Sequence, residues 1–342
     1  MPLATLVVML CTGVLVAQPQ TRSFEMGLIY WPPMGEQTPE PIIKAGIGRT
    51  LENAEHLLVQ LPWRPGVNGN PGPDVAAWAA WIGTIARDHD KRLTVAVDWQ
   101  DATRTALYES KAHPWCWRDD STRTAFVAMA RQVAERYRPA WFVLGVEVNY
   151  HAHLDAPDFQ AFVEAYREAQ RAVKAISPAT RVLVTFQHEF ITGRDRHWNV
   201  RANLDPVRAF GDSLDALGLS LYPHLAGLRP GEIDAGYFDE VAALQLPMAV
   251  FETAWPSVAP WTDDIQADYA RRMLAAADAC GMGLVVWTST TDTMLLPDVE
   301  TDRGEFDAAG NWMRFLGLYR IEGQPKASSE PWRQWLARPR RE

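Results

Sequence analysis

Short apolar runs rich in β-branched and aromatic residues alternate with longer amphipathic stretches from residue 24 onward. The longer stretches have helical spacing. In one of them Phe126, Met129, Ala130 and Val133 recur at i, i+3, i+4 and i+7, which places them on one face of a helix. The short runs predict eight strands, at residues 25–31, 56–63, 92–99, 141–149, 181–188, 216–222, 248–252 and 283–288.

Alternation of strands with helices predicts a parallel sheet in which helices make the crossovers. Eight such units in a chain of this length fit one α/β domain, a (β/α)₈ TIM barrel, which we assign to residues 24–337. A doubly wound open sheet is the alternative fold. It is less favoured because neither G-x-G-x-x-G nor G-x-x-x-x-G-K-[ST] follows the first strand.

The charge balance and the hydropathy of the chain argue against nucleic acid as a partner and against a membrane span. The chain has 33 Lys and Arg against 42 Asp and Glu, so it lacks the excess of cations that a nucleic-acid groove needs. Its one long apolar run, residues 3–17, is shorter than the roughly 20 residues of a membrane span. We interpret residues 1–20 as a signal peptide or disordered leader and expect export, with membrane association through an uncleaved leader as the alternative. The sequence does not indicate the oligomeric state of the protein.

The active site of a TIM barrel forms where the strands end. Two glutamates stand at such positions, Glu147 in Leu-Gly-Val-Glu-Val-Asn and Glu252 in Ala-Val-Phe-Glu-Thr-Ala-Trp-Pro. An ionised glutamate there is costly without a partner or a function. Glycosidic bond cleavage uses such a pair, so the two residues predict a glycosidase that needs no cofactor and no metal.

Further polar and aromatic residues at strand ends are candidates for contact with a carbohydrate, because flat indole faces suit the apolar faces of sugar rings. Tryptophan is frequent at these positions: Trp31, Trp63, Trp99, Trp115, Trp117, Trp255, Trp261 and Trp287. Packing in the core is the alternative role for each of them. The predicted substrate contacts are Trp31, Asp98, Asn149, Gln187, Tyr222, His224, Trp255 and Trp287.

Four motifs, at residues 145–149, 219–223, 251–256 and 285–287, resemble those of glycoside hydrolase clan A, especially the arabinogalactan endo-β-1,4-galactanase type. The resemblance implies that Glu147 is the acid/base and Glu252 the nucleophile of a retaining mechanism. It also implies that Tyr222 hydrogen-bonds the nucleophile and that Trp287 forms a platform under the sugar. Retention requires carboxyl groups about 5 to 5.5 Å apart, a protonated acid/base and an ionised nucleophile.

One residue departs from the clan pattern. The clan usually has asparagine immediately before the acid/base, where it contacts the sugar 2-hydroxyl, and this chain has Val146. Asn149 shares strand parity with Glu147, so it would project to the same side if the strand extends that far. We therefore expect Asn149 to replace the missing amide in part.

Two other functions are compatible with the sequence. A carbohydrate-binding barrel that has lost turnover is suggested by Val146, and it would bind a glycan without releasing reducing ends. A metal-dependent barrel hydrolase is suggested by histidines that follow strands, His151, His153, His188 and His224. The H-x-H pair at 151–153 follows the fourth predicted strand, whereas barrel metallohydrolases have such a pair after the first.

Overall fold

The computed structural model describes residues 20–29, 39–196, 198–293 and 312–341. Nearly all of the predicted leader, residues 1–19, lies outside the described residues, and so does Trp31. Among the described residues, no helix has both the length and the apolar character required to cross a membrane.

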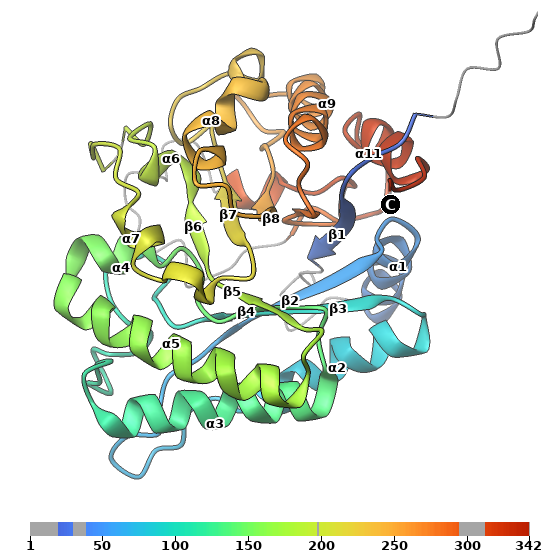
Figure 1. Cartoon of the computed structure of the whole chain (residues 1–342). Helices are drawn as coiled ribbons and strands as arrows, with labels where there is room; N and C mark the ends of the chain where they lie inside the picture. The colour runs from blue at the N-terminus through green and yellow to red at the C-terminus, as the bar shows by residue number, and fades with distance from the viewer. Residues whose placement is uncertain (1–19, 30–38, 197, 294–311, 342) are drawn as a thin grey trace, which may run out of the picture.

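The described strands form one parallel sheet (Figure 1). They are β1 Glu25–Ile29, β2 His56–Pro62, β3 Arg92–Asp98, β4 Trp141–Val143, β5 Arg181–Leu183, β6 Thr185–Gln187, β7 Leu217–Leu221, β8 Met248–Thr253 and β9 Leu284–Trp287. β5 pairs with β4, and β6 pairs with β7. Only Val184 separates β5 from β6, so together they are the fifth strand, which joins the two ends of the sheet. The chain is a TIM barrel, as the sequence predicts.

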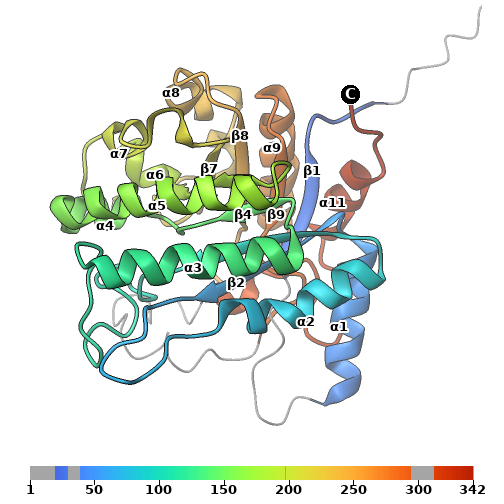
Figure 2. The same cartoon turned by 60° about the horizontal axis from the view of Figure 1, so that its bottom comes forward.

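Helices cover the outside of the barrel. They are α1 Glu40–Glu52, α2 Val75–Asp88, α3 Asp120–Tyr137, α4 Asn149–Leu154, α5 Ala156–Ile176, α6 His188–Ile191, α7 Asp205–Arg208, α8 Asp239–Ala242, α9 Asp263–Ala279 and α11 Ser329–Leu336. Figure 2 shows α2, α3 and α5 in a row along one side, consistent with the contacts between neighbours in that row. The predicted apolar face of α3 is buried.

Local sequence explains where several helices begin. Asp74 accepts a hydrogen bond from Ala77 N at 2.9 Å and caps α2, and Asp155 accepts one from Asp158 N at 3.0 Å and caps α5. Such caps satisfy amide groups that have no partner inside the helix. They fix where each crossover helix starts after its loop.

The fourth strand is shorter than predicted. β4 ends at Val143, and the chain bends through residues 144–148 instead of continuing to Asn149. The bend brings the backbone of Gly145 close to other groups, because a Cβ there would lie 2.7 Å from Val148 Cγ1 and 2.8 Å from Trp99 Nε1. Thr185 N donates to Gly145 O at 2.9 Å and Val148 N to Thr185 O at 3.0 Å. The bent segment therefore stays beside the fifth strand and positions Glu147.

The amino-terminal end of the barrel contains a buried charge cluster. Glu25, at the start of β1, contacts His56 Nε2 at 2.8 Å and forms short ion pairs with Arg92 and Arg340. Burial opposes ionisation of this carboxyl, but the hydrogen bond and charge of His56, with the two arginines, lower the pKa of Glu25 to about 2. Since the opposite end holds the active site in this fold, we assign the cluster to stability.

Candidate active site

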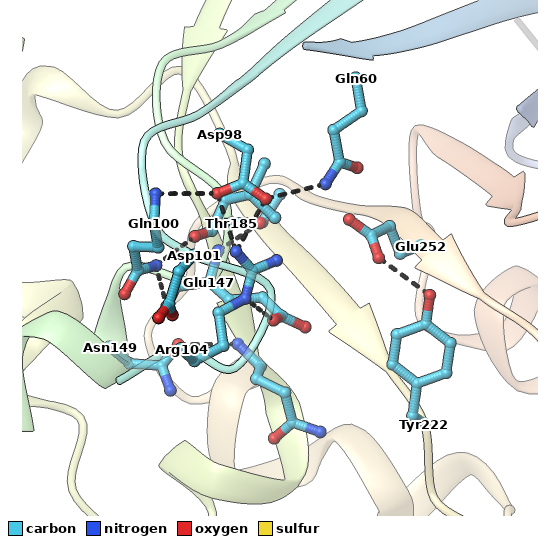
Figure 3. Close-up of polar contacts among 12 residues, drawn as sticks. Gln60, Asp98, Gln100, Asp101, Arg104, Glu147, Asn149, Thr185, Tyr222 and Glu252 are labelled. Carbon is cyan, nitrogen blue, oxygen red and sulfur yellow. Dashed lines mark hydrogen bonds and ion pairs between the residues drawn. The ribbon is translucent and has the colours of Figure 1, made fainter. Parts of the chain in front are cut away.

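Glu147 and Glu252 come from barrel strands four and seven and face the same space (Figure 3). Glu147 lies in the bend after β4, and Glu252 lies in β8, which is the seventh barrel strand because β5 and β6 form one. Both are buried, with exposed fractions of 7% and 9%. The charge of Glu147 contributes to the raised pKa of Glu252.

Tyr222 holds Glu252 in place. Its hydroxyl donates to Glu252 Oε2 at 2.9 Å, which confirms the contact expected between these residues, and Thr288 Oγ1 lies 2.9 Å from the same hydroxyl. Burial, and then the charge of Glu147, raise the pKa of Glu252 to about 8. Arg104 and the Tyr222 hydrogen bond act in the opposite direction. This direction differs from our expectation of a readily ionised nucleophile, because burial outweighs the donors.

The backbone of Glu147 is held in a left-handed conformation with φ of +50°. For a residue with a side chain this costs on the order of 1 kcal/mol or more, so neighbours must maintain it. Glu147 N donates to Thr185 Oγ1 at 2.9 Å. Gln100 Nε2 donates to the carbonyls of Val146 at 2.7 Å and Glu147 at 3.2 Å. These three bonds aim the carboxyl of Glu147 into the site.

Arg104 connects Asp98 to Glu147 and was not predicted as a site residue. Its Nε donates to Glu147 Oε2 at 2.8 Å, and its Nη1 lies 2.8 and 2.7 Å from the two carboxylate oxygens of Asp98. Burial opposes its charge, but Asp98 and Glu147 outweigh burial and raise the pKa of Arg104. A partly buried Asp98 needs a cation, and that requirement was the only sequence signal for an arginine in the following loop.

The loop that carries Arg104 is shaped by Asp101. Its Oδ1 accepts hydrogen bonds from the backbone N of Thr105 at 3.0 Å and of Ala106 at 3.3 Å, and Arg104 itself has φ of +61°. Gln60 Nε2 also donates to Asp98 Oδ2 at 3.1 Å. Asp98 is thus held by β2 on one side and by this loop on the other, and its contact with substrate stays a prediction.

Asn149 and Gln187 support the backbone of the site. Asn149 Oδ1 accepts from Gln187 N at 2.8 Å, and Gln187 Oε1 accepts from Phe190 N at 2.5 Å to cap α6. The parity argument for Asn149 was wrong, because β4 ends at Val143 and Asn149 begins α4. Gln187 Nε2 donates to Glu189 Oε2 at 2.5 Å, so the groups of this side chain are used within the protein.

Glu189 is a buried carboxyl behind the site, and at the sequence level it was considered only as a possible metal ligand. It accepts from Tyr222 N at 3.2 Å and forms a short hydrogen bond with the Tyr237 hydroxyl. Burial raises the pKa of Glu189 to about 7 against these donors. Because it holds the backbone of Tyr222, it supports the contact between Tyr222 and Glu252.

His224 and Trp255 lie together beside Tyr222. Their ring centroids are 5.5 Å apart, and Trp312 lies 4.6 Å from His224. Burial lowers the pKa of His224 to about 3, so its imidazole is neutral at physiological pH. Both ring nitrogens of His224 and Nε1 of Trp255 are buried without a hydrogen-bond partner among the described residues.

Most of the candidate tryptophans pack in the core. Trp287 is completely buried, its Nε1 donates to Leu316 O at 2.8 Å, and it lies 6.1 Å from Trp332. It presents no face to a sugar in this structure, so the platform prediction is not met. Four more form one cluster with centroid distances of 5.1 to 5.6 Å: Trp63, Trp99, Trp115 and Trp117. Their role in this structure is packing, the alternative that the sequence left open.

The histidines do not converge. His151 Nε2 lies 3.0 Å from Asp158 Oδ2, and His188 Nε2 lies 3.1 Å from Tyr237 O. Within the described part of the chain, no group of three or more His, Cys, Asp or Glu side chains is arranged to hold a metal ion.

Comparison of the sequence with protein-family models and with curated proteins gives no match. Several solved structures are similar to the structure of this chain. A GH5_18 protein from Bifidobacterium longum subsp. longum has a TM-score of 0.66 at 14% identity, covering 93% of this chain and 81% of its own. The exo-β-1,4-mannosidase Op5Man5 from Opitutaceae bacterium strain TAV5 has a TM-score of 0.66 at 18% identity, with 94% and 60% covered.

A GH113 β-1,4-mannanase has a TM-score of 0.56 at 13% identity, with 93% of this chain and 100% of its own covered. These neighbours are clan A glycoside hydrolases. The similarity establishes that the chain has the TIM-barrel fold that they share.

Proposed function

We propose that this protein is a retaining glycoside hydrolase that cleaves a β-linked poly- or oligosaccharide. The observation that carries the proposal is the convergence of two buried glutamates from barrel strands four and seven, with the Tyr222 hydroxyl 2.9 Å from Glu252. Paired carboxyls on either side of a scissile bond are the chemical requirement of this reaction. The glycoside hydrolases among the structural neighbours support it.

In this mechanism Glu252 attacks the anomeric carbon while Glu147 gives its proton to the departing glycosidic oxygen. Water then attacks the glycosyl–enzyme ester, Glu147 takes a proton from that water, and Glu252 leaves as a carboxylate. Both glutamates end in their starting states. Tyr222 stabilises the charge that returns to Glu252, which is why its position matters for both steps.

The first step requires the proton on Glu147. In the ligand-free site Arg104 donates to Glu147, while the pKa of Glu252 is raised to about 8. Catalysis therefore needs the proton on Glu147 and an ionised Glu252.

Two substrates are the leading candidates. The neighbours include an exo-β-1,4-mannosidase and a β-1,4-mannanase, which favours a β-mannan, and the sequence motifs resemble those of galactanases, which favours a β-1,4-galactan. The second candidate function is a carbohydrate-binding barrel without turnover. Val146, with no side-chain donor, and the arginine on Glu147 favour that alternative.

The test is reducing-sugar release from β-mannan, β-galactan, β-glucan and xylan by wild type, Glu147→Ala and Glu252→Ala. We expect turnover of one glycan, a loss of about 10²–10⁴-fold in Glu147→Ala, and a loss at least as large in Glu252→Ala. The exposed Glu330→Ala is the matched control. The anomer released first, followed by NMR, tests retention. Saturable glycan binding without product would establish the binding-protein alternative instead.

Export also remains a prediction. It rests on the apolar run at residues 3–17, and mass spectrometry of protein secreted by an expressing bacterium would test it.

A further inference from the structure

Val146 leaves the site without a side-chain donor at the position before Glu147. Its side chain is buried and apolar, and its carbonyl already accepts from Gln100 Nε2 at 2.7 Å. Hydrogen bonds to the sugar 2-hydroxyl strengthen in the transition state of glycoside hydrolysis. If the chain hydrolyses glycans, another residue has to supply this contact.

Arg104 has a donor that neither Glu147 nor Asp98 uses. Nε is bound to Glu147 and Nη1 to Asp98, whereas Nη2 has no hydrogen-bond partner among the described residues. The side chain of Arg104 is 12% exposed. Nη2 is not among the described polar atoms that are both buried and without a hydrogen-bond partner. Figure 3 shows the guanidinium beside Glu147, on the side of the site that faces Glu252, and Arg104 lowers the pKa of Glu252.

The guanidinium is also fixed before substrate binds. A planar group held at Nε by one carboxylate and at Nη1 by another has its third nitrogen in a set direction. Such preorganisation makes a contact more effective, since little rotational freedom is lost when the ligand arrives. Arg104 is thus a rigid donor bound to Glu147, and its charge acts on Glu252.

Asn149 is the rival donor. Its Nδ2 has no partner in the described part of the chain, but it is buried, and the amide is held by the bond from Gln187 N to Oδ1. A ligand reaches it only after the surrounding side chains move, whereas the side chain of Arg104 is 12% exposed.

We propose that Arg104 donates through Nη2 to the hydroxyl next to the anomeric carbon of the bound sugar and replaces the amide that Val146 lacks. The inference rests on the proposed glycosidase function. It makes Arg104 a residue that orients the substrate at the reacting carbon.

The test compares kcat/KM for 4-nitrophenyl β-mannoside and β-galactoside with that for their 2-deoxy counterparts. We expect wild type to prefer the 2-hydroxy sugar by about 10–100-fold, the range for a hydrogen bond from a charged donor. In Arg104→Met and Arg104→Lys this preference should fall to within about threefold. Any effect through Glu147 changes both substrates alike and cancels in the ratio. Arg64→Met, which removes an arginine paired with Glu109, is the matched control.

A preference that stays intact in both Arg104 variants, with unchanged melting temperatures, overturns the assignment. A preference lost in Asn149→Ala instead would give the role to Asn149. If wild type hydrolyses neither glycoside, calorimetric titration with the same pairs of glycosides tests the contact of Arg104 with the 2-hydroxyl separately from hydrolysis. A binding preference that Arg104→Met abolishes would support Arg104 while the proposed hydrolysis fails, and equal affinities or no binding would overturn the Arg104 assignment as well.

Discussion

The hydroxyl of Tyr222 lies 2.9 Å from Oε2 of Glu252, and this contact joins the end of β7 to the neighbouring strand β8. Tyr222 is itself held from behind, because its backbone N donates to the buried carboxyl of Glu189 at 3.2 Å. The carboxyl that the mechanism needs as nucleophile therefore depends on a chain of contacts reaching into the core.

Replacement Tyr222→Phe removes this donor and keeps the ring. We expect kcat to fall about 10–100-fold, since a hydrogen bond to a charged group is worth roughly 1.5–3 kcal/mol, while the melting temperature changes little. Steady-state kinetics on the glycan identified by the substrate panel provides the measurement. An unchanged kcat would contradict the role of Tyr222.

The raised pKa of Glu252 predicts an unusual pH profile. Its pKa of about 8 lies above the usual 4.5, so the ionised nucleophile forms only as the pH rises towards 8. We expect kcat/KM for an activated aryl glycoside to increase over this range, because kcat/KM reports the free enzyme.

Glu147→Gln removes a charge that raises this pKa, so the rising limb should move to lower pH. Wild type and Glu147→Gln can be compared on a substrate with an activated leaving group, because the departure of that group needs no proton from Glu147. If kcat/KM rises over the same pH range in both proteins, Glu147 does not act on Glu252.

The tryptophan cluster predicts a change in stability without a change in catalysis. Trp117 lies 5.5 Å from Trp63 and 4.8 Å from Phe162, measured between ring centroids. We expect Trp117→Ala to lower the free energy of unfolding by about 3–5 kcal/mol and to leave kcat/KM of the folded fraction within about twofold. Urea denaturation measures the first quantity.

Trp78→Ala is the control, because Trp78 is 49% exposed on α2 and should change stability by no more than about 0.5 kcal/mol. A specific loss of glycan affinity in Trp117→Ala would return this residue to the binding site.

The cluster at the amino-terminal end of the barrel predicts acid sensitivity. The pKa of Glu25 is lowered to about 2, so its ionised form stabilises the fold above pH 4.5, and this stabilisation is lost as the pH falls from 4.5 towards 2. We expect Glu25→Gln to cost about 3 kcal/mol at pH 7 and progressively less below pH 4.5.

Unfolding curves at pH 7, 5, 4 and 3 measure this difference, with the exposed Glu330→Gln as control. A cost that is the same at every pH would show that the charge of Glu25 contributes nothing.

Local sequence was sufficient for the barrel and for its two glutamates. The apolar spacing of α3 follows from 3.6 residues per turn, and a short apolar run bounded by polar residues is a strand wherever it lies in the chain. Glu252 could be predicted as a site residue for the same reason, because it stands at the end of a short apolar run. These features depend on neighbours in sequence, so periodicity and composition determined them.

The tertiary structure decided which groups meet. The bend after Val143, the pairing of Arg104 with Glu147, and the burial of Glu189 depend on residues that are distant in sequence. It also decided that Trp287 packs in the core. The sequence pattern of a tryptophan at a strand end is the same whether the side chain contacts a ligand or other aromatic rings. Close packing of separate segments sets these contacts, and local patterning does not encode them.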